Sequence, residues 1–222
     1  MSAFQIAGCS GAGKSAIAAV LALRGLVSID ADDDPLLARF VDPAGAVVAE
    51  VPTAPDLAWL DRHGWAWNPA RLDELILAAA PATLYVCGGA DNQHELAGRF
   101  AQVFLLEIDE PTMLARLDAR RDYHDWGRIG DTREYLRRKR PALQDRLRAS
   151  GAIPLDARQP LDHVVDAILS RTLGGFAGDK ARLFVMCRDL RSAQQTSMMA
   201  HISRCFLHVA IAMCRCTVRG DW

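Results

Sequence analysis

Five short apolar runs recur along the chain, and each is almost free of polar residues. They are residues 4–7, 26–29, 83–87, 103–108 and 152–155. Near-continuous apolar runs of this length are typical of strands that are buried on both faces, as in a parallel sheet. The pattern therefore predicts a five-stranded parallel sheet.

Longer segments with helical periodicity alternate with these runs. The segments are residues 16–23, about 69–80, about 111–121, 132–150 and 161–173. Strands that alternate with helices predict an α/β fold of three layers, in which helices cover both faces of the sheet. Because such folds bind ligands at the carboxyl ends of their strands, we expect residues 1–173 to form one domain with its site at that edge.

Three segments fall outside the alternation. Residues 41–68 are rich in Pro, Gly and Trp and follow no clean period. They indicate either an insertion on the substrate side or a surface loop pinned by buried tryptophans. Residues 122–131 are a candidate lid. After a Gly-rich linker at 174–178, residues 174–222 predict a C-terminal extension, helical or poorly ordered, through which the chain could form oligomers.

Composition argues against several classes of protein. The formal net charge of −1 is atypical of a general nucleic-acid binder. No apolar run is long enough to span a bilayer, and the N-terminus lacks the charged segment of a signal peptide. The six cysteines show no zinc-site spacing. We therefore expect a reduced, cytoplasmic protein that acts on a small molecule, without nucleic-acid or membrane partners.

The strongest chemical signal lies between the first predicted strand and the first predicted helix. Residues 8–15 read Gly-Cys-Ser-Gly-Ala-Gly-Lys-Ser, a complete G-x-x-x-x-G-K-S phosphate loop. The candidate ATP-binding residues are Gly8, Gly11, Ala12, Gly13, Lys14, Ser15 and Ala16. Lys14 would neutralise the β- and γ-phosphates, and the Ser15 hydroxyl would ligate Mg²⁺. The alternative is a glycine turn that binds nothing.

An acidic pair follows the second predicted strand. Asp30 ends the strand and Asp32 comes two residues later. On an extended chain alternate side chains point the same way, so both carboxylates would face the site. Asp30 is the candidate to support Mg²⁺ beside Ser15, and Asp32 to orient an acceptor hydroxyl or take its proton. An acidic cap before Pro35 is the alternative.

Two glycines follow the third predicted strand. Gly88 and Gly89 carry no side chain that would keep an acceptor away, and their N–H groups could hold its phosphate or carboxylate. They are therefore candidate substrate-binding residues. A plain turn is the alternative.

Arginines surround the candidate lid. They are Arg116, Arg120, Arg121 and Arg128. Arg116 and Arg120 have i, i+4 spacing, which places them on one face of a helix. Guanidinium groups suit the charge on a phosphoryl group in transfer, so Arg116, Arg120 and the lid residue Arg128 are catalytic candidates. Arg121 is a candidate contact to the acceptor.

With these motifs the sequence resembles the small kinases of the P-loop NTPase superfamily, namely the nucleoside monophosphate kinases and the shikimate and gluconate kinase group. The resemblance covers about residues 3–172 and rests on Gly8–Ser15, Asp30-x-Asp32, Gly88-Gly89 and Arg116-x-x-x-Arg120. It implies Mg-ATP on the loop and an acceptor under the lid. Three arginines compete to bind an acceptor carboxylate, namely Arg39, Arg62 and Arg71. The Trp-rich insertion fits shikimate kinases poorly and would suit stacking on a base.

The sequence therefore predicts an ATP-dependent kinase that acts on a small molecule, with a nucleotide or nucleoside as the first choice of acceptor. A hydroxyl kinase of the shikimate or gluconate type is the nearest alternative. The alternative from another class is a nucleotide-binding regulatory or assembly ATPase. The chain shows no Asn-Lys-x-Asp motif of a GTPase, and its third strand does not end in the Asp-Glu pair of a mechanical ATPase. Both observations favour a kinase.

Overall fold

The computed structural model describes residues 2–120 and 126–172, which lie in the compact unit Met1–Thr172. Residues 121–125, which include the start of the predicted lid, lie outside the described residues. So do the predicted linker and extension, which fall in the second unit, Leu173–Trp222.

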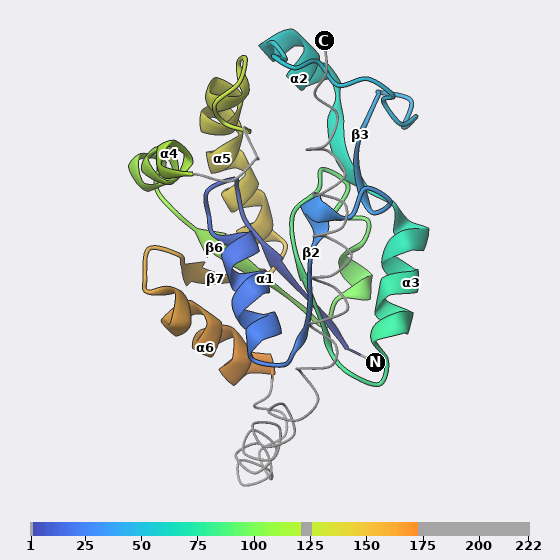
Figure 1. The fold of residues 1–222 in the computed structure, drawn as a ribbon, viewed down its shortest axis with the longest axis vertical. Coiled ribbons are helices and arrows are strands. Elements are labelled where there is room, and N and C mark those ends of the chain that lie inside the picture. The colour runs from blue at the N-terminus through green and yellow to red at the C-terminus, as the bar shows by residue number, and fades with distance from the viewer. Residues whose placement is uncertain (1, 121–125, 173–222) are drawn as a thin grey trace, which may run out of the picture. The chain divides into compact units, whose positions relative to one another are not determined.

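A five-stranded parallel sheet forms the centre of the domain (Figure 1). Its strands, in spatial order, are β2 (Val27–Asp30), β5 (Leu84–Cys87), β1 (Ala3–Ala7), β6 (Gln102–Glu107) and β7 (Ile153–Asp156). Every neighbouring pair is parallel. All residues of β1 and β5 are buried, which explains their unbroken apolar sequence. The predicted sheet is confirmed.

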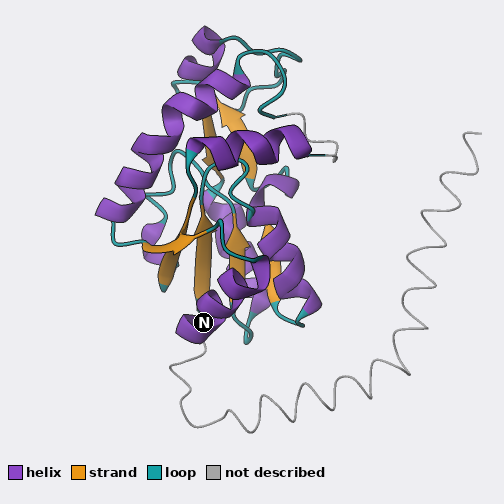
Figure 2. Ribbon diagram, turned by 90° about the vertical axis from the view of Figure 1, so that its left-hand side faces the viewer, coloured by secondary structure: helices purple, strands orange, loops and turns teal. Residues whose placement is uncertain are grey.

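Helices cover both faces of this sheet (Figure 2). They are α1 (Lys14–Leu23), α3 (Pro69–Ala79), α4 (Glu110–Ala119), α5 (Thr132–Ala149) and α6 (Leu161–Thr172). Neighbouring residues of β1 separate the two faces, because Phe4 packs with α1 and α6 whereas Ala3 packs with α3. The three-layer arrangement is therefore confirmed.

Local sequence fixes where these helices begin. Asn68 accepts hydrogen bonds from Ala70 N and Arg71 N, and Pro69 opens α3. Asp109 caps α4 in the same way, through Thr112 N at 2.8 Å. Among the described residues, no helix is long and apolar enough to cross a membrane.

The predicted insertion at 41–68 contains regular structure. It holds α2 (Leu57–Arg62) and an antiparallel hairpin of β3 (Ala38–Val41) and β4 (Gly64–Trp67). Trp67 is 2% exposed and packs in the core, whereas Trp59 and Trp65 are half-buried. One tryptophan therefore anchors the segment in the core, and two others remain at its surface.

Side chains from the loop after β5 hold the hairpin against the domain. Trp67 N donates to Asn92 Oδ1 at 3.0 Å, and Asn92 Nδ2 donates to Trp67 O at 2.9 Å. Trp65 N donates to Asp91 Oδ2 at 2.9 Å, and Asp91 N donates to Trp65 O at 2.7 Å. Asp91 and Asn92 thus bond to the N–H and carbonyl groups of β4 as a neighbouring strand would. Because these two residues follow the carboxyl end of β5, the hairpin lies at the carboxyl edge of the sheet.

Candidate active site

The phosphate loop joins β1 to α1 at this edge. Gly11 and Gly13 have φ values of 81° and 99°, a left-handed conformation that favours glycine. α1 begins at Lys14 with no side-chain cap. The first N–H groups of a helix have no partner within the helix, and the helix dipole is positive at that end. The loop is therefore built to receive an anion.

Packing beneath the loop explains two of its glycines. A Cβ atom at Gly8 would lie 3.1 Å from Leu106 Cβ of β6. At Gly11 it would lie 3.2 Å from Met113 O of α4, in addition to the unfavourable φ. Side chains at these positions would push the loop away from the sheet and from α4.

Arg116 holds the loop from α4. Its Nη1 lies 3.3 Å from both Gly11 O and Ala12 O, and its Nη2 donates to Ala157 O at 2.7 Å. The guanidinium group thus joins the phosphate loop to the turn after β7. In this arrangement Arg116 supports the loop backbone, a role that the sequence did not indicate.

Ser15 and Asp30 come together as the sequence suggested. Burial raises the pKa of the Asp30 carboxyl, a hydrogen bond with the Ser15 hydroxyl opposes this rise, and the charge of Asp32 adds to it. Lys14 Nζ lies 3.3 Å from Cys9 O, across the loop. A hydroxyl and a carboxylate side by side are oxygen ligands of the kind that Mg²⁺ takes, directly or through water. The residues therefore fit Mg-ATP.

Asp32 reaches the site by a different route from the one expected. β2 ends at Asp30, and Ala31–Asp33 form a 3₁₀ turn in which Asp32 N donates to Asp30 Oδ1 at 3.1 Å. The extended-chain argument was wrong, because the turn and not strand alternation brings the two carboxylates together. Asp32 is exposed, and its Oδ1 accepts a hydrogen bond from Trp65 Nε1 at 3.1 Å.

The two glycines after β5 differ from each other. Gly88 N donates to Ile6 O at 3.0 Å within the sheet, so this amide is not available to an acceptor anion. Its missing side chain has a packing reason, because a Cβ there would lie 2.5 Å from Ala31 Cβ and 2.8 Å from Trp67 Cζ2. Gly89 lies beside the phosphate loop, where its Cβ would be 3.9 Å from Gly8 O.

The lid arginines contact the backbone around the lid. α4 ends at Ala119, and Arg120 has extended backbone angles, so it does not share a helical face with Arg116 as the spacing suggested. Arg120 Nη1 lies 3.4 Å from Trp126 O, and Arg128 Nη1 donates to Arg120 O at 2.7 Å. Arg121 lies outside the described residues.

The end of the lid contacts the insertion. Asp131 N donates to Pro55 O at 2.9 Å, and Leu57 N donates to Asp131 Oδ2 at 3.0 Å. Gly130 lies so close to Pro55 that a Cβ would be 2.4 Å from the Pro55 carbonyl oxygen. The end of the predicted lid and the segment before α2 are therefore joined by hydrogen bonds.

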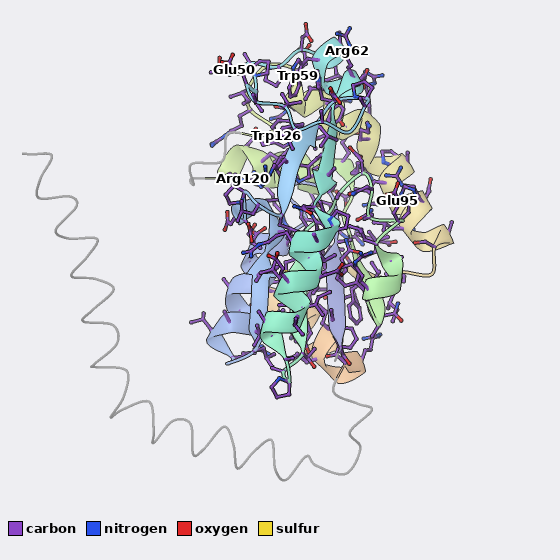
Figure 3. The ribbon with its side chains drawn as sticks, turned by 90° about the vertical axis from the view of Figure 1, so that its right-hand side faces the viewer. Glu50, Trp59, Arg62, Glu95, Arg120 and Trp126 are labelled. Atoms are coloured by element: carbon purple, nitrogen blue, oxygen red, sulfur yellow. The ribbon has the colours of Figure 1, made fainter. Side chains whose placement is uncertain are left out.

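An aromatic cluster lies at this contact. It consists of Phe40, Trp59, Trp65 and Trp126, and Phe40 is its centre, with ring centroids 5.0, 4.9 and 5.5 Å from the three tryptophans. Figure 3 shows Trp59 and Trp126 from this cluster, with Arg120 below Trp126. All four side chains are half-buried. Trp59 also stacks on His63, with centroids 4.3 Å apart.

The three arginines that competed for an acceptor anion are in different situations. Arg71 pairs with Asp34, with Nε and Nη2 both 3.0 Å from Oδ2, and with Glu74. Arg62 is exposed at the end of α2. Arg39 on β3 has a buried Nε atom without an acceptor, and among the described residues it has no ion pair. Of the three, Arg39 is therefore the one with a buried guanidinium nitrogen that lacks an acceptor.

Arg140 on α5 is a further arginine that the sequence analysis did not single out. Its Nη1 donates to Ile108 O at 3.2 Å, and its Nε is buried without an acceptor. Burial raises the pKa of the Cys9 thiol, and the charges of Lys14 and Arg140 oppose that rise. Arg140 thus adds positive charge beneath the phosphate loop. The sequence does not distinguish Arg140 from the exposed charged residues that precede it on α5.

No protein-family model matches the sequence, and no curated protein sequence gives a significant match. Three solved structures are among those similar to this chain. They are a sugar kinase from Janibacter sp. HTCC2649 (20% identity, 77% of this chain and 93% of that chain, TM-score 0.46), shikimate kinase from Acinetobacter baumannii in complex with shikimate (18%, 79% and 94%, 0.45) and deoxyadenosine kinase from M. mycoides with bound dATP (16%, 78% and 99%, 0.46).

The order of the sheet and the loop after its central strand define the class of fold. β1 lies in the middle of the sheet, carries the phosphate loop at its carboxyl end and continues into α1. The predicted three-layer P-loop NTPase fold is therefore confirmed. At the identities of these similar structures the likeness concerns the fold alone, and the chemistry has to come from the side chains of this chain.

Proposed function

We propose that the protein is a kinase that transfers the γ-phosphoryl group of Mg-ATP to a small molecule. One observation carries the proposal. A phosphate loop with Lys14 and Ser15 meets Asp30 at the carboxyl edge of the sheet, and an exposed carboxylate, Asp32, lies one turn further on. A nucleotide hydrolase needs the first group of residues, but a kinase also needs a residue that faces an acceptor.

The ATP end of the site uses backbone and charge. The amides of the loop and of the first turn of α1 bind phosphate oxygens, and Lys14 exchanges its 3.3 Å contact with Cys9 O for the β- and γ-phosphates. Ser15 and Asp30 would hold Mg²⁺, which would neutralise phosphate charge when it is bound. Arg116 keeps the loop carbonyls in place during the reaction.

The acceptor end of the site centres on Asp32. Its Oδ1 is held by Trp65, which leaves Oδ2 to accept a hydrogen bond from an acceptor hydroxyl and then its proton. This chemistry suits a hydroxyl acceptor. The rings of Trp65 and Trp126, which border the same region, offer flat apolar surface for a base. A nucleotide or nucleoside that presents a hydroxyl is therefore our first choice.

A hydroxy acid of the shikimate or gluconate type is the second candidate. The observation that favours it is Arg39 Nε, which is buried without an acceptor and is available to donate to an anionic ligand. Arg39 follows Ala38 and precedes Phe40 on β3, so its side chain leaves the hairpin on the face opposite to the aromatic cluster.

A coupled assay of ADP release tests the proposal. The purified full chain receives Mg-ATP with nucleoside monophosphates, nucleosides, shikimate, gluconate or small amino alcohols in separate reactions. We expect turnover that depends on one class of acceptor, and that class decides between the two candidates. ATP hydrolysis that stays slow and equal with every acceptor would contradict the proposal and favour a regulatory or assembly ATPase. We also propose that the protein works in the cytoplasm and that residues 174–222 serve association between subunits.

A further inference from the structure

The orientation of the exposed carboxylate of Asp32 depends on one neighbour. Asp32 lies in a short 3₁₀ turn and has no ion pair among the residues that the structure describes. Among the described residues, its side-chain partner is the Trp65 indole, whose Nε1 donates to Oδ1 at 3.1 Å. An exposed aspartate without such a partner samples several rotamers. The indole therefore selects among the orientations of this carboxylate.

Two backbone hydrogen bonds and one ring contact hold Trp65 in place. Its N–H and its carbonyl both bond to Asp91, at 2.9 and 2.7 Å. Its ring contacts Phe40, with centroids 4.9 Å apart and planes at 64°. A donor that is fixed at its backbone and at its ring loses little further entropy when it binds Asp32. The indole N–H is thus a preorganised donor.

The chemistry of the donor suits its place. Indole is neutral and donates one hydrogen bond only. A lysine or arginine at this position would also hold the carboxylate, but its charge would compensate the negative charge that attracts a hydroxyl proton. Trp65 holds Oδ1 without that compensation and leaves Oδ2 free for another donor.

We propose that Trp65 is a positioning residue, which fixes the Asp32 carboxylate with Oδ2 toward the acceptor hydroxyl. The inference rests on the proposed function, because it assigns Asp32 to the acceptor. It concerns a residue of the Trp-rich segment that contacts neither ATP nor the transferred phosphoryl group. Losing the indole N–H should therefore slow transfer while ATP binding is unchanged.

Kinetics of matched tryptophan variants test the role. Trp65→Phe keeps an aromatic ring beside Phe40 but removes the N–H. We expect it to lower kcat about ten-fold, the loss typical of a hydrogen bond to a charged group, with the KM for ATP unchanged. Trp59→Phe is the control, because Trp59 contacts the same Phe40 ring and makes no bond to Asp32. It should keep the kcat of the wild-type protein.

A double-mutant cycle and an NMR signal separate this inference from the proposed function. Trp65→Phe should cost nothing further when Asp32 is already replaced by Ala. In ¹⁵N-labelled protein the indole signal of Trp65, assigned by its absence in Trp65→Phe, should shift in Asp32→Asn more than the indole signal of Trp59.

Two results would overturn the inference. One is an indole signal of Trp65 that does not respond to Asp32→Asn, which can be seen without any activity. The other is an active wild-type kinase in which Trp65→Phe and Trp59→Phe have the same kcat. Failure of the proposed function looks different, because the wild-type protein itself would then show no acceptor-dependent release of ADP, and the NMR result would still decide whether Trp65 fixes Asp32.

Discussion

The two halves of the candidate site are built in different ways. The phosphate loop is a single run of eight residues whose shape comes from left-handed glycines and from the start of α1. The acceptor half brings together Asp32, Trp65 and Trp126 from three separate segments. In the proposed function, local backbone would bind the phosphates, and long-range side-chain contacts would form the surface that an acceptor meets. Variants of the two halves should therefore differ in what they impair.

The largest effect is expected from Lys14→Ala in the phosphate loop. The ammonium group is the mobile charge for the β- and γ-phosphates, so its loss should reduce transfer about a thousand-fold and weaken ATP binding. Titration of a fluorescent ATP analogue, together with the ADP-release assay, measures both quantities. Wild-type affinity for ATP in this variant would show that the loop binds nucleotide by its backbone alone.

Asp32→Asn should impair the acceptor half only. An amide cannot take the proton of an acceptor hydroxyl, so we expect kcat to fall about a hundred-fold while the affinity for ATP is unchanged. The same two measurements apply. If activity is fully retained, Asp32 has no part in the mechanism, and the proposed acceptor half of the site is wrong.

Gly88→Ala tests the packing beneath the acceptor half. The new methyl group would lie 2.5 Å from Ala31 Cβ and 2.8 Å from Trp67 Cζ2, so the free energy of unfolding should fall by about 1–3 kcal/mol. Urea denaturation measures the change. Gly98→Ala is the control, since no heavy atom lies within 4 Å of its added Cβ, and it should alter stability by less than about 0.5 kcal/mol. Equal stability of the two variants would contradict the packing role of Gly88.

Arg39→Met distinguishes the classes of acceptor. If an anion of the acceptor pairs with Arg39, the KM for that acceptor should rise about ten-fold while the KM for ATP stays constant. Arg62→Met provides the comparison, because Arg62 is exposed at the end of α2. Steady-state kinetics with the acceptor found in the panel give the result, and a KM that is unchanged in Arg39→Met would remove the acidic-acceptor candidate.

The smallest effect concerns the pH dependence of stability. Burial raises the pKa of Asp30, so the folded protein binds its proton more tightly than the unfolded chain does. Stability contributed by this group is therefore lost as the pH rises through the folded pKa. Asp30→Asn removes the ionisation. The difference in free energy of unfolding between this variant and the wild type should therefore shift in favour of the variant as pH rises. Urea denaturation of both proteins from about pH 4 to 8 tests this. If the free energies of unfolding of the wild type and of Asp30→Asn change in parallel with pH, burial of the charged Asp30 carboxylate does not reduce stability.

The fold could be predicted because its signals are local. Buried strands such as Leu84–Cys87 appear as continuous apolar runs, and helix starts such as Asn68-Pro69 carry their own capping residues. The phosphate loop is also a local pattern. The sequence therefore contained the five strands, the flanking helices and the position of the candidate phosphate loop.

The acceptor half could not be predicted to the same extent, because its contacts join distant residues. The bond between Trp65 and Asp32 spans 33 positions, and no periodicity marks it. The i, i+4 spacing of Arg116 and Arg120 was misleading, since α4 ends between them at Ala119. The role of Arg116 also depends on a hydrogen bond to Ala157 O, although Ala157 lies 41 positions further along the chain. Such contacts follow from tertiary packing, which a single sequence does not display.

The close approach of Gly88 to Ala31 and Trp67 has a consequence for how this protein can evolve. A side chain at position 88 fits without strain only if the side chains at positions 31 and 67 leave more space. The three positions are therefore expected to change together in descendants of this sequence, whereas exposed positions nearby are free to vary alone. A saturation library at these three positions, selected for folded protein, would show the dependence as pairs of substitutions that are tolerated only in combination.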